Sequence, residues 1–78
     1  TTIQLKIAET GVLIDTATLL VRENWLEAHR HVENRSRPSL EDRARWRRDA
    51  SHAAGCCVRA VDIIHGVSGA TANYLDNM

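Results

Sequence analysis

The stretch Ile3–Val32, IQLKIAETGVLIDTATLLVRENWLEAHRHV, decides the fold. At about 100° per residue, the period of an α-helix, its large apolar residues form two rows on nearly opposite sides. One row, here called the leucine row, consists of Leu5, Val12, Leu19 and Leu26. The other, the isoleucine row, consists of Ile7, Ile14, Val21, Trp25, Ala28 and Val32. This pattern predicts a helix from about Ile3 to about Glu33 that is apolar on two sides.

A helix in a two-helix hairpin needs only one apolar face. The 78 residues offer one other long helix, so we expect one row to pack against it and the other to meet something outside the chain. The sequence therefore predicts a piece of a larger helical bundle, placed at an interface between subunits.

A second helix is predicted from about Leu40 to about His65. Pro38 disfavours helix at Arg37, and Ser39 with Asp42 forms a capping-box-like start. We expect the buried stripe of this helix to be Trp46, Ala50, Ala53, Cys57, Val61 and Ile64. Gly66 and Gly69 are expected to end it in a turn, followed by the start of a third helix. The short break makes the two long helices antiparallel neighbours.

The composition excludes several functional classes. The formal net charge is zero, which argues against a nucleic-acid partner. No apolar run is long enough to span a bilayer, which argues against a membrane protein. Cys56 and Cys57 are adjacent and poorly placed to bond each other, so free thiols in a reducing cytoplasm are expected. A start without Met suggests that residues 1–78 are part of a helical domain cut from a longer polypeptide.

The histidines do not predict a catalytic or metal site. His29 and His31 are two apart and point about 200° away from each other on a helix, so they cannot chelate together. His52 and Cys56 share a face, but two ligands fall short of a metal site. His65 suits the negative end of a helix dipole. We expect no metal ligand and no catalytic residue in this chain.

A basic run, Arg43, Arg45, Arg47 and Arg48, opens the second helix. These arginines spread around the helix and alternate with acids, which indicates a solvated surface with pairs such as Glu41–Arg45. Ion pairs between subunits, or contact with a phosphate-bearing ligand, are the alternatives.

Several short sequence segments resemble the C-terminal helical domain of the acyl-CoA dehydrogenase fold, in the branch of two-component flavin-dependent monooxygenases. They are Ile14–Ala17 (IDTA), Ser39–Arg45 (SLEDRAR), Arg47–Ala50 (RRDA), Cys57–Asp62 (CVRAVD), Gly66–Ala70 (GVSGA) and Tyr74. The resemblance covers nearly the whole chain and consists of helical sequence segments rather than a catalytic signature. It implies an all-α fold, with two long antiparallel helices and the start of a third, as part of a four-helix bundle in the core of a tetramer.

The same resemblance implies a flavin site. The loop at Gly66, Ser68 and Gly69 would approach a flavin, FMN or FAD, and Asp62 stands where dehydrogenase relatives tend to have a flavin-contacting Gln. A separate reductase would supply reduced flavin, and oxygen would hydroxylate an aromatic or polyketide-like small molecule. The family's catalytic histidine would lie beyond Met78, so His65 does not take its place.

Two other functions are consistent with the sequence. One is acyl-CoA dehydrogenation by the same fold with FAD, which requires a carboxylate base outside this chain. The other is a small helical oligomerisation module without enzymatic activity, which would fold alone as a discrete oligomer.

Overall fold

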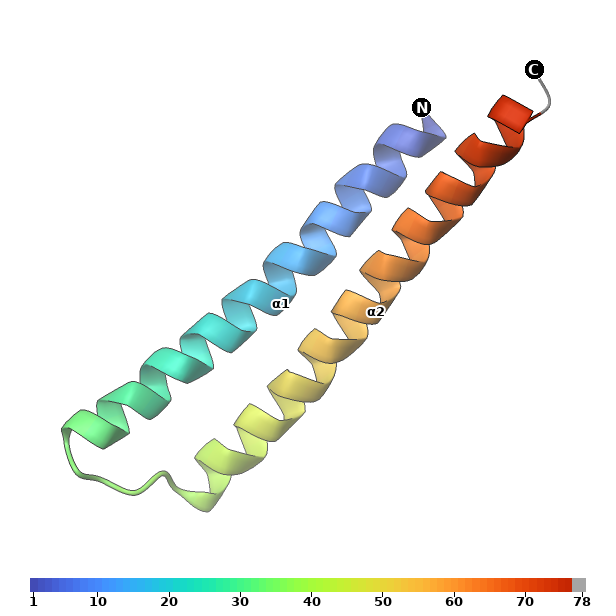
Figure 1. Ribbon diagram of the computed structural model, residues 1–78. Coiled ribbons are helices and arrows are strands. Elements are labelled where there is room, and N and C mark those ends of the chain that lie inside the picture. Colours follow the sequence, from blue (N-terminus) through green and yellow to red (C-terminus); the bar gives the residue numbers. More distant parts are fainter. Residues whose placement is uncertain (77–78) are drawn as a thin grey trace.

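The computed structural model describes residues 1–76, without the side chains of residues 71, 72 and 74–76. Two α-helices make up this part of the chain, α1 (Thr2–Glu33) and α2 (Leu40–Asp76). They run antiparallel and bring the start of α1 and the end of α2 to the same end of a long rod (Figure 1), which measures 63 × 16 × 15 Å. The predicted pair of long antiparallel helices is thus confirmed.

Local sequence signals fix the start of each helix. Thr1 caps α1, because its hydroxyl accepts from the Gln4 N–H at 3.2 Å and the Gln4 side chain accepts from the Thr1 amine at 3.1 Å. At α2 the Ser39 hydroxyl accepts from the Asp42 N–H at 3.0 Å, and the Asp42 carboxylate accepts from the Ser39 N–H at 3.0 Å. The capping box predicted at Ser39 is therefore present.

The predicted end of the second helix is wrong. Gly66 and Gly69 lie inside α2, which continues to Asp76, and no described glycine has a positive φ. Glycine in a helix interior costs about 1 kcal/mol relative to alanine but does not force termination. There is consequently neither a glycine turn nor the start of a third helix before Asp76.

The assignment of the buried stripes also needs correction. The side of α1 that faces α2 lies between the two apolar rows and carries Thr10, Leu13 and Ala17. The larger residues of both rows stay exposed in this chain, with Leu19 67% and Trp25 62% accessible, whereas Ala28 is half-buried. We expected one of them to pack against the second helix, and neither does.

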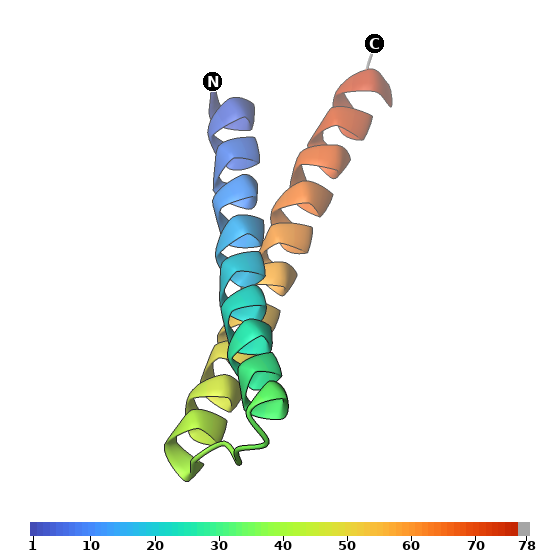
Figure 2. The ribbon, with the colours of Figure 1, turned by 90° about the vertical axis from the view of Figure 1, so that its left-hand side faces the viewer.

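On α2 the buried residues are Asp49, Ala53, Cys56 and Ala60, with Ile63 packed against them. Of the predicted stripe, Ala53 is buried and Trp46 half-buried, whereas Ala50, Cys57, Val61 and Ile64 are exposed. Small side chains at the contact allow two helix backbones to approach closely. The side view shows the helices splaying apart toward the start of α1 and the end of α2 (Figure 2).

The hairpin has little hydrophobic core of its own. Its core cluster consists of Leu13, Ala17, Ala53, Cys56 and Ala60, and no large side chain in the described part is fully buried. The radius of gyration is 18.0 Å, whereas a compact domain of this length would have about 11.5 Å. The hairpin is therefore elongated rather than compact.

Candidate functional site

Polar side chains connect the two helices along their contact. Arg59 Nη2 donates to Glu9 Oε1 at 3.3 Å, and Asn24 Nδ2 donates to Asp49 Oδ2 at 3.1 Å. Near the hairpin turn, Arg45 pairs with Glu27 and with Asp42. The expected Glu41–Arg45 pair is absent from the ion pairs of the described residues, because Arg45 reaches across to α1 instead.

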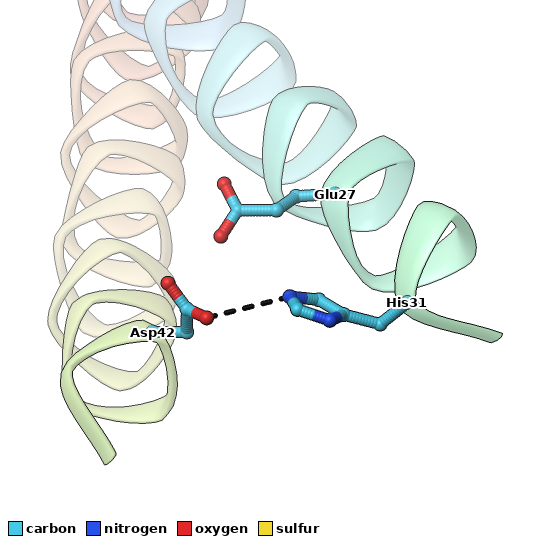
Figure 3. Close-up of side chains that lie close together, drawn as sticks. All are labelled: Glu27, His31 and Asp42. Carbon is cyan, nitrogen blue, oxygen red and sulfur yellow. Dashed lines mark ion pairs between the residues drawn. The ribbon is translucent and has the colours of Figure 1, made fainter. Parts of the chain in front are cut away.

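The densest group of ionisable side chains lies at the turn, where Glu27 and His31 of α1 meet Asp42 of α2 (Figure 3). His31 Nε2 lies 3.3 Å from Asp42 Oδ2, and its Nδ1 lies 2.8 Å from the Ser36 hydroxyl. The potential ligand atoms of the three residues lie within 4.8 Å of one another. The sequence reading missed this group, although antiparallel pairing across a short break brings the end of one helix to the start of the next.

This arrangement is a clamp for the turn rather than an open metal site. The Arg45 guanidinium bonds both Glu27 and Asp42, so a cation of the protein already satisfies the two carboxylates. Asp42 additionally caps α2 through Ser39. The Asp42 carboxylate thus contacts both Ser39, at the start of α2, and His31, in the last turn of α1.

The two neighbouring histidines have separate surroundings, as their spacing predicted. His29 stacks on Trp25 with ring centroids 5.3 Å apart and lies 3.0 Å from Glu33. His31 turns toward α2 and meets Trp46 edge-on at 6.1 Å. The other pair that we considered, His52 and Cys56, lines one depression on α2, with His52 exposed and Cys56 buried.

Two carboxyl groups in these contacts have lowered pKa values. The Ser39 backbone N–H, followed by Arg45, holds the pKa of Asp42 below its usual value. The side-chain amide of Asn24, followed by Arg48, lowers the pKa of Asp49. Such bonds favour the ionised carboxylate in the folded chain.

These shifts predict a loss of stability in acid. A depressed carboxyl pKa contributes stability above the unfolded value, about 3.9 for Asp, which is lost as the pH falls through the folded value. We expect the melting temperature, followed by circular dichroism, to fall as the pH drops below about 4. The double variant Asp42→Asn/Asp49→Asn should be less stable at pH 6 but lose less on acidification. An unchanged pH slope in this variant would contradict the assignment.

The residues expected to contact a flavin lie on the exposed surface of α2 rather than in a loop. Asp62, Gly66 and Gly69 are spaced at i, i+4 and i+7 and share its outer side, away from α1. At 100° per residue, Ser68 lies about 120° around the helix from Asp62, about 160° from Gly66 and about 100° from Gly69. The structure therefore brings three of the four residues together. Because they are inside a helix, their backbone amides are not free to form a phosphate-binding loop.

The two glycines leave bare backbone on that side. A Cβ added at Gly66 or at Gly69 would meet nothing within 4 Å. The backbone at these two positions is therefore open to close approach from outside the hairpin.

Comparison with known proteins gives the family. The model of the acyl-CoA dehydrogenase C-terminal domain matches residues 1–78. The chain belongs to this family. Both described elements of this acyl-CoA dehydrogenase C-terminal domain are helices, as the sequence resemblance implied.

A similar curated protein points to one group of enzymes related to this family. Over 73 residues the chain is 32% identical to the oxygenase component of p-hydroxyphenylacetate 3-hydroxylase from Acinetobacter baumannii. The aligned part covers 94% of this chain and 17% of that protein. No solved structure shows significant similarity. Within the described residues, neither helix of this acyl-CoA dehydrogenase C-terminal domain is apolar over a length that could cross a bilayer.

Proposed function

We propose that this chain is the C-terminal helical part of the oxygenase component of a two-component flavin-dependent monooxygenase. The observation that carries the proposal is the 32% identity, over 94% of the chain, to such an oxygenase component. Because the match covers 17% of that protein, we propose that residues 1–78 form a partial domain of a longer polypeptide.

In this role the chain supplies a scaffold and one wall of the flavin site. Reduced flavin, FMN or FAD, would arrive from a separate reductase and would supply the chemistry by which oxygen hydroxylates an aromatic or polyketide-like substrate. Asp62, Gly66 and Gly69 on the outer side of α2 would approach the flavin and exclude water. Ser68 would contact it only from the edge of that surface. The chain would provide no catalytic acid or base.

Assembly is the second part of the proposal. Both apolar rows of α1 are exposed in the single hairpin, and exposed apolar surface of this extent is typical of an interface. We propose that the hairpin is half of a four-helix bundle and that the bundles meet in a homo-oligomer, a tetramer by analogy with the family.

Acyl-CoA dehydrogenation with FAD remains the alternative, because the family model that matches is described as an acyl-CoA dehydrogenase domain. A reaction assay on the whole polypeptide separates the two. With reduced flavin, oxygen and p-hydroxyphenylacetate as a probe, a monooxygenase forms a product heavier by one oxygen atom. A dehydrogenase instead oxidises an acyl-CoA with an added electron acceptor. Activity in neither assay would favour the non-enzymatic helical module.

The proposed contact of α2 with the flavin is tested by titrating the whole polypeptide with reduced flavin. We expect Gly69→Leu to weaken binding roughly tenfold or more, because the side chain fills space that the ligand needs, a change of about 1.4 kcal/mol. Gly55→Leu is the matched control, since Gly55 is also an exposed glycine inside α2 with nothing within 4 Å of an added Cβ. Equal affinities of the two variants would remove Gly69 from the flavin site.

A further inference from the structure

Ser36, just beyond the end of α1, lies directly against the ring of His31. Its backbone N–H donates to the His31 carbonyl at 2.9 Å, and Arg35 before it has the positive φ, 52°, that this kind of helix end requires. The Ser36 hydroxyl is thereby 2.8 Å from His31 Nδ1, whereas the His31 carbonyl oxygen is farther from it, at 3.5 Å. The end of the helix therefore sets a hydroxyl against an imidazole nitrogen.

The Asp42 carboxylate decides which nitrogen of His31 carries the proton. Its Oδ2 lies 3.3 Å from His31 Nε2. The Ser39 backbone N–H holds the pKa of Asp42 below its usual value, so this carboxyl group is ionised near neutral pH. An ionised carboxylate only accepts hydrogen bonds, so neutral His31 carries its proton on Nε2. The lone pair of Nδ1 then faces the Ser36 hydroxyl and can accept its proton.

The side chains around this hydroxyl are arranged for attack on a small molecule. Ser36 is exposed, whereas the side chains of His31 and Asp42 are only 24% and 21% accessible. Beside Ser36 there is a pocket of about 230 Å³, lined by residues that include Arg30 and Asn34. The side chains of these two residues carry N–H groups, which can stabilise an oxygen that becomes negative when a carbonyl carbon is attacked.

Other groups near His31 hold its ring rather than compete with Ser36. Glu27 lies close to His31 and lines the same pocket, but its carboxylate pairs with Arg45. Trp46 of α2 meets the ring edge-on, with ring centroids 6.1 Å apart. The imidazole is thus positioned from α2 while its Nδ1 faces the loop.

We propose that Ser36 is a nucleophile for short-chain carboxylic esters, with His31 as its general base and Asp42 as the positioning residue that orients the imidazole. The order of nucleophile, base and carboxylate is that of serine hydrolases. This activity is separate from the proposed flavin chemistry and does not depend on it.

The reaction proceeds in two halves. Ser36 Oγ forms a bond to the ester carbonyl carbon while its proton passes to His31 Nδ1. The bond between that carbon and the alcohol oxygen then breaks, and the leaving alcohol takes the proton from His31. Water attacks the resulting acyl-serine by the same steps, which releases the carboxylic acid and restores the Ser36 hydroxyl.

The decisive experiment treats the whole polypeptide, without flavin, with p-nitrophenyl acetate and locates the acetyl group by peptide mass spectrometry. We expect acetylation of Ser36 with release of p-nitrophenolate. Ser36→Ala should lose the acetylated peptide, and His31→Gln should slow acetylation roughly a hundredfold, the lower end of the usual contribution of a general base. His29→Gln is the matched control and should change little, because His29 also pairs with a carboxylate, that of Glu33 at 3.0 Å, but its ring stacks on Trp25.

Asp42 is tested by two substitutions that differ in charge. Asp42→Asn should slow acetylation roughly tenfold or more, because an amide can donate to Nε2 and so turn the proton-bearing nitrogen toward Ser36. Asp42→Glu keeps the charge and should restore part of the rate. Circular dichroism of each variant reports whether helix content is kept.

Three results would overturn the proposal. They are a wild-type protein without an acetyl group on Ser36, an unchanged rate in His31→Gln, and equal losses of rate in His29→Gln and His31→Gln. None of them would alter the flavin titration.

Discussion

Replacing Leu13 with alanine is expected to lower the free energy of unfolding by about 2 kcal/mol. Leu13 is the one large aliphatic residue in the buried cluster, at 9% exposure. The other members of the buried cluster are small, and Ile63 packs against the cluster from its edge, so only part of the space that the leucine side chain leaves can be filled. The value is placed at the low end for buried leucines because the hairpin is open at its sides and can partly close around the gap.

Leu19→Ala provides the matched control, since Leu19 is on the same helix and is 67% exposed. The free energy of unfolding of Leu19→Ala should fall by no more than about 0.5 kcal/mol. Urea unfolding of both variants at low protein concentration, where association does not contribute, measures the difference. A loss at Leu19 as large as at Leu13 would mean that the leucine row, not the strip between the rows, faces α2.

The second large loss of stability is expected when a larger side chain is introduced into the contact between the helices. Ala53 is 4% exposed in the contact between the helices, so a leucine there must either push the helices apart or bend into the adjoining groove, which Ala53 also lines. We expect Ala53→Leu to cost about 1–3 kcal/mol, the usual range for overpacking.

Ala44→Leu controls for the change in residue type, because Ala44 is an exposed position in the same helix. Leucine is nearly as good a helix former as alanine, so this variant should be close to neutral. Thermal unfolding monitored at 222 nm compares the two. If Ala53→Leu were as stable as Ala44→Leu, the close approach of the helices at Ala53 would be refuted.

The predicted flavin-facing residues show how far sequence resemblance reaches. It named Asp62, Gly66, Ser68 and Gly69, and helix geometry places three of them on one surface while separating Ser68 from them. Resemblance transfers identity and order along the chain but not local conformation. The glycines were expected to form a turn because glycine often follows the last residue of a helix, and here they remain helical without a positive φ.

What the sequence by itself determined was local. The break between Asn34 and Ser39, the cap formed by Ser39 and Asp42, and the amphipathic period of α1 depend on residues within a few positions of one another. Hydrogen bonds of a capping box and steric limits before proline act over that range and need no tertiary partner.

Only the tertiary structure decided which side of each helix is buried within the hairpin. The most apolar rows suggested the contact, yet the helices meet through Thr10, Ala17, Asp49 and Ala53. Small residues permit a close backbone approach, and Asp49 is tolerated there because Asn24 donates a hydrogen bond to it. Burial of a side chain depends on the partner surface and on the distance between helix axes, and neither quantity can be calculated from the periodicity of one helix.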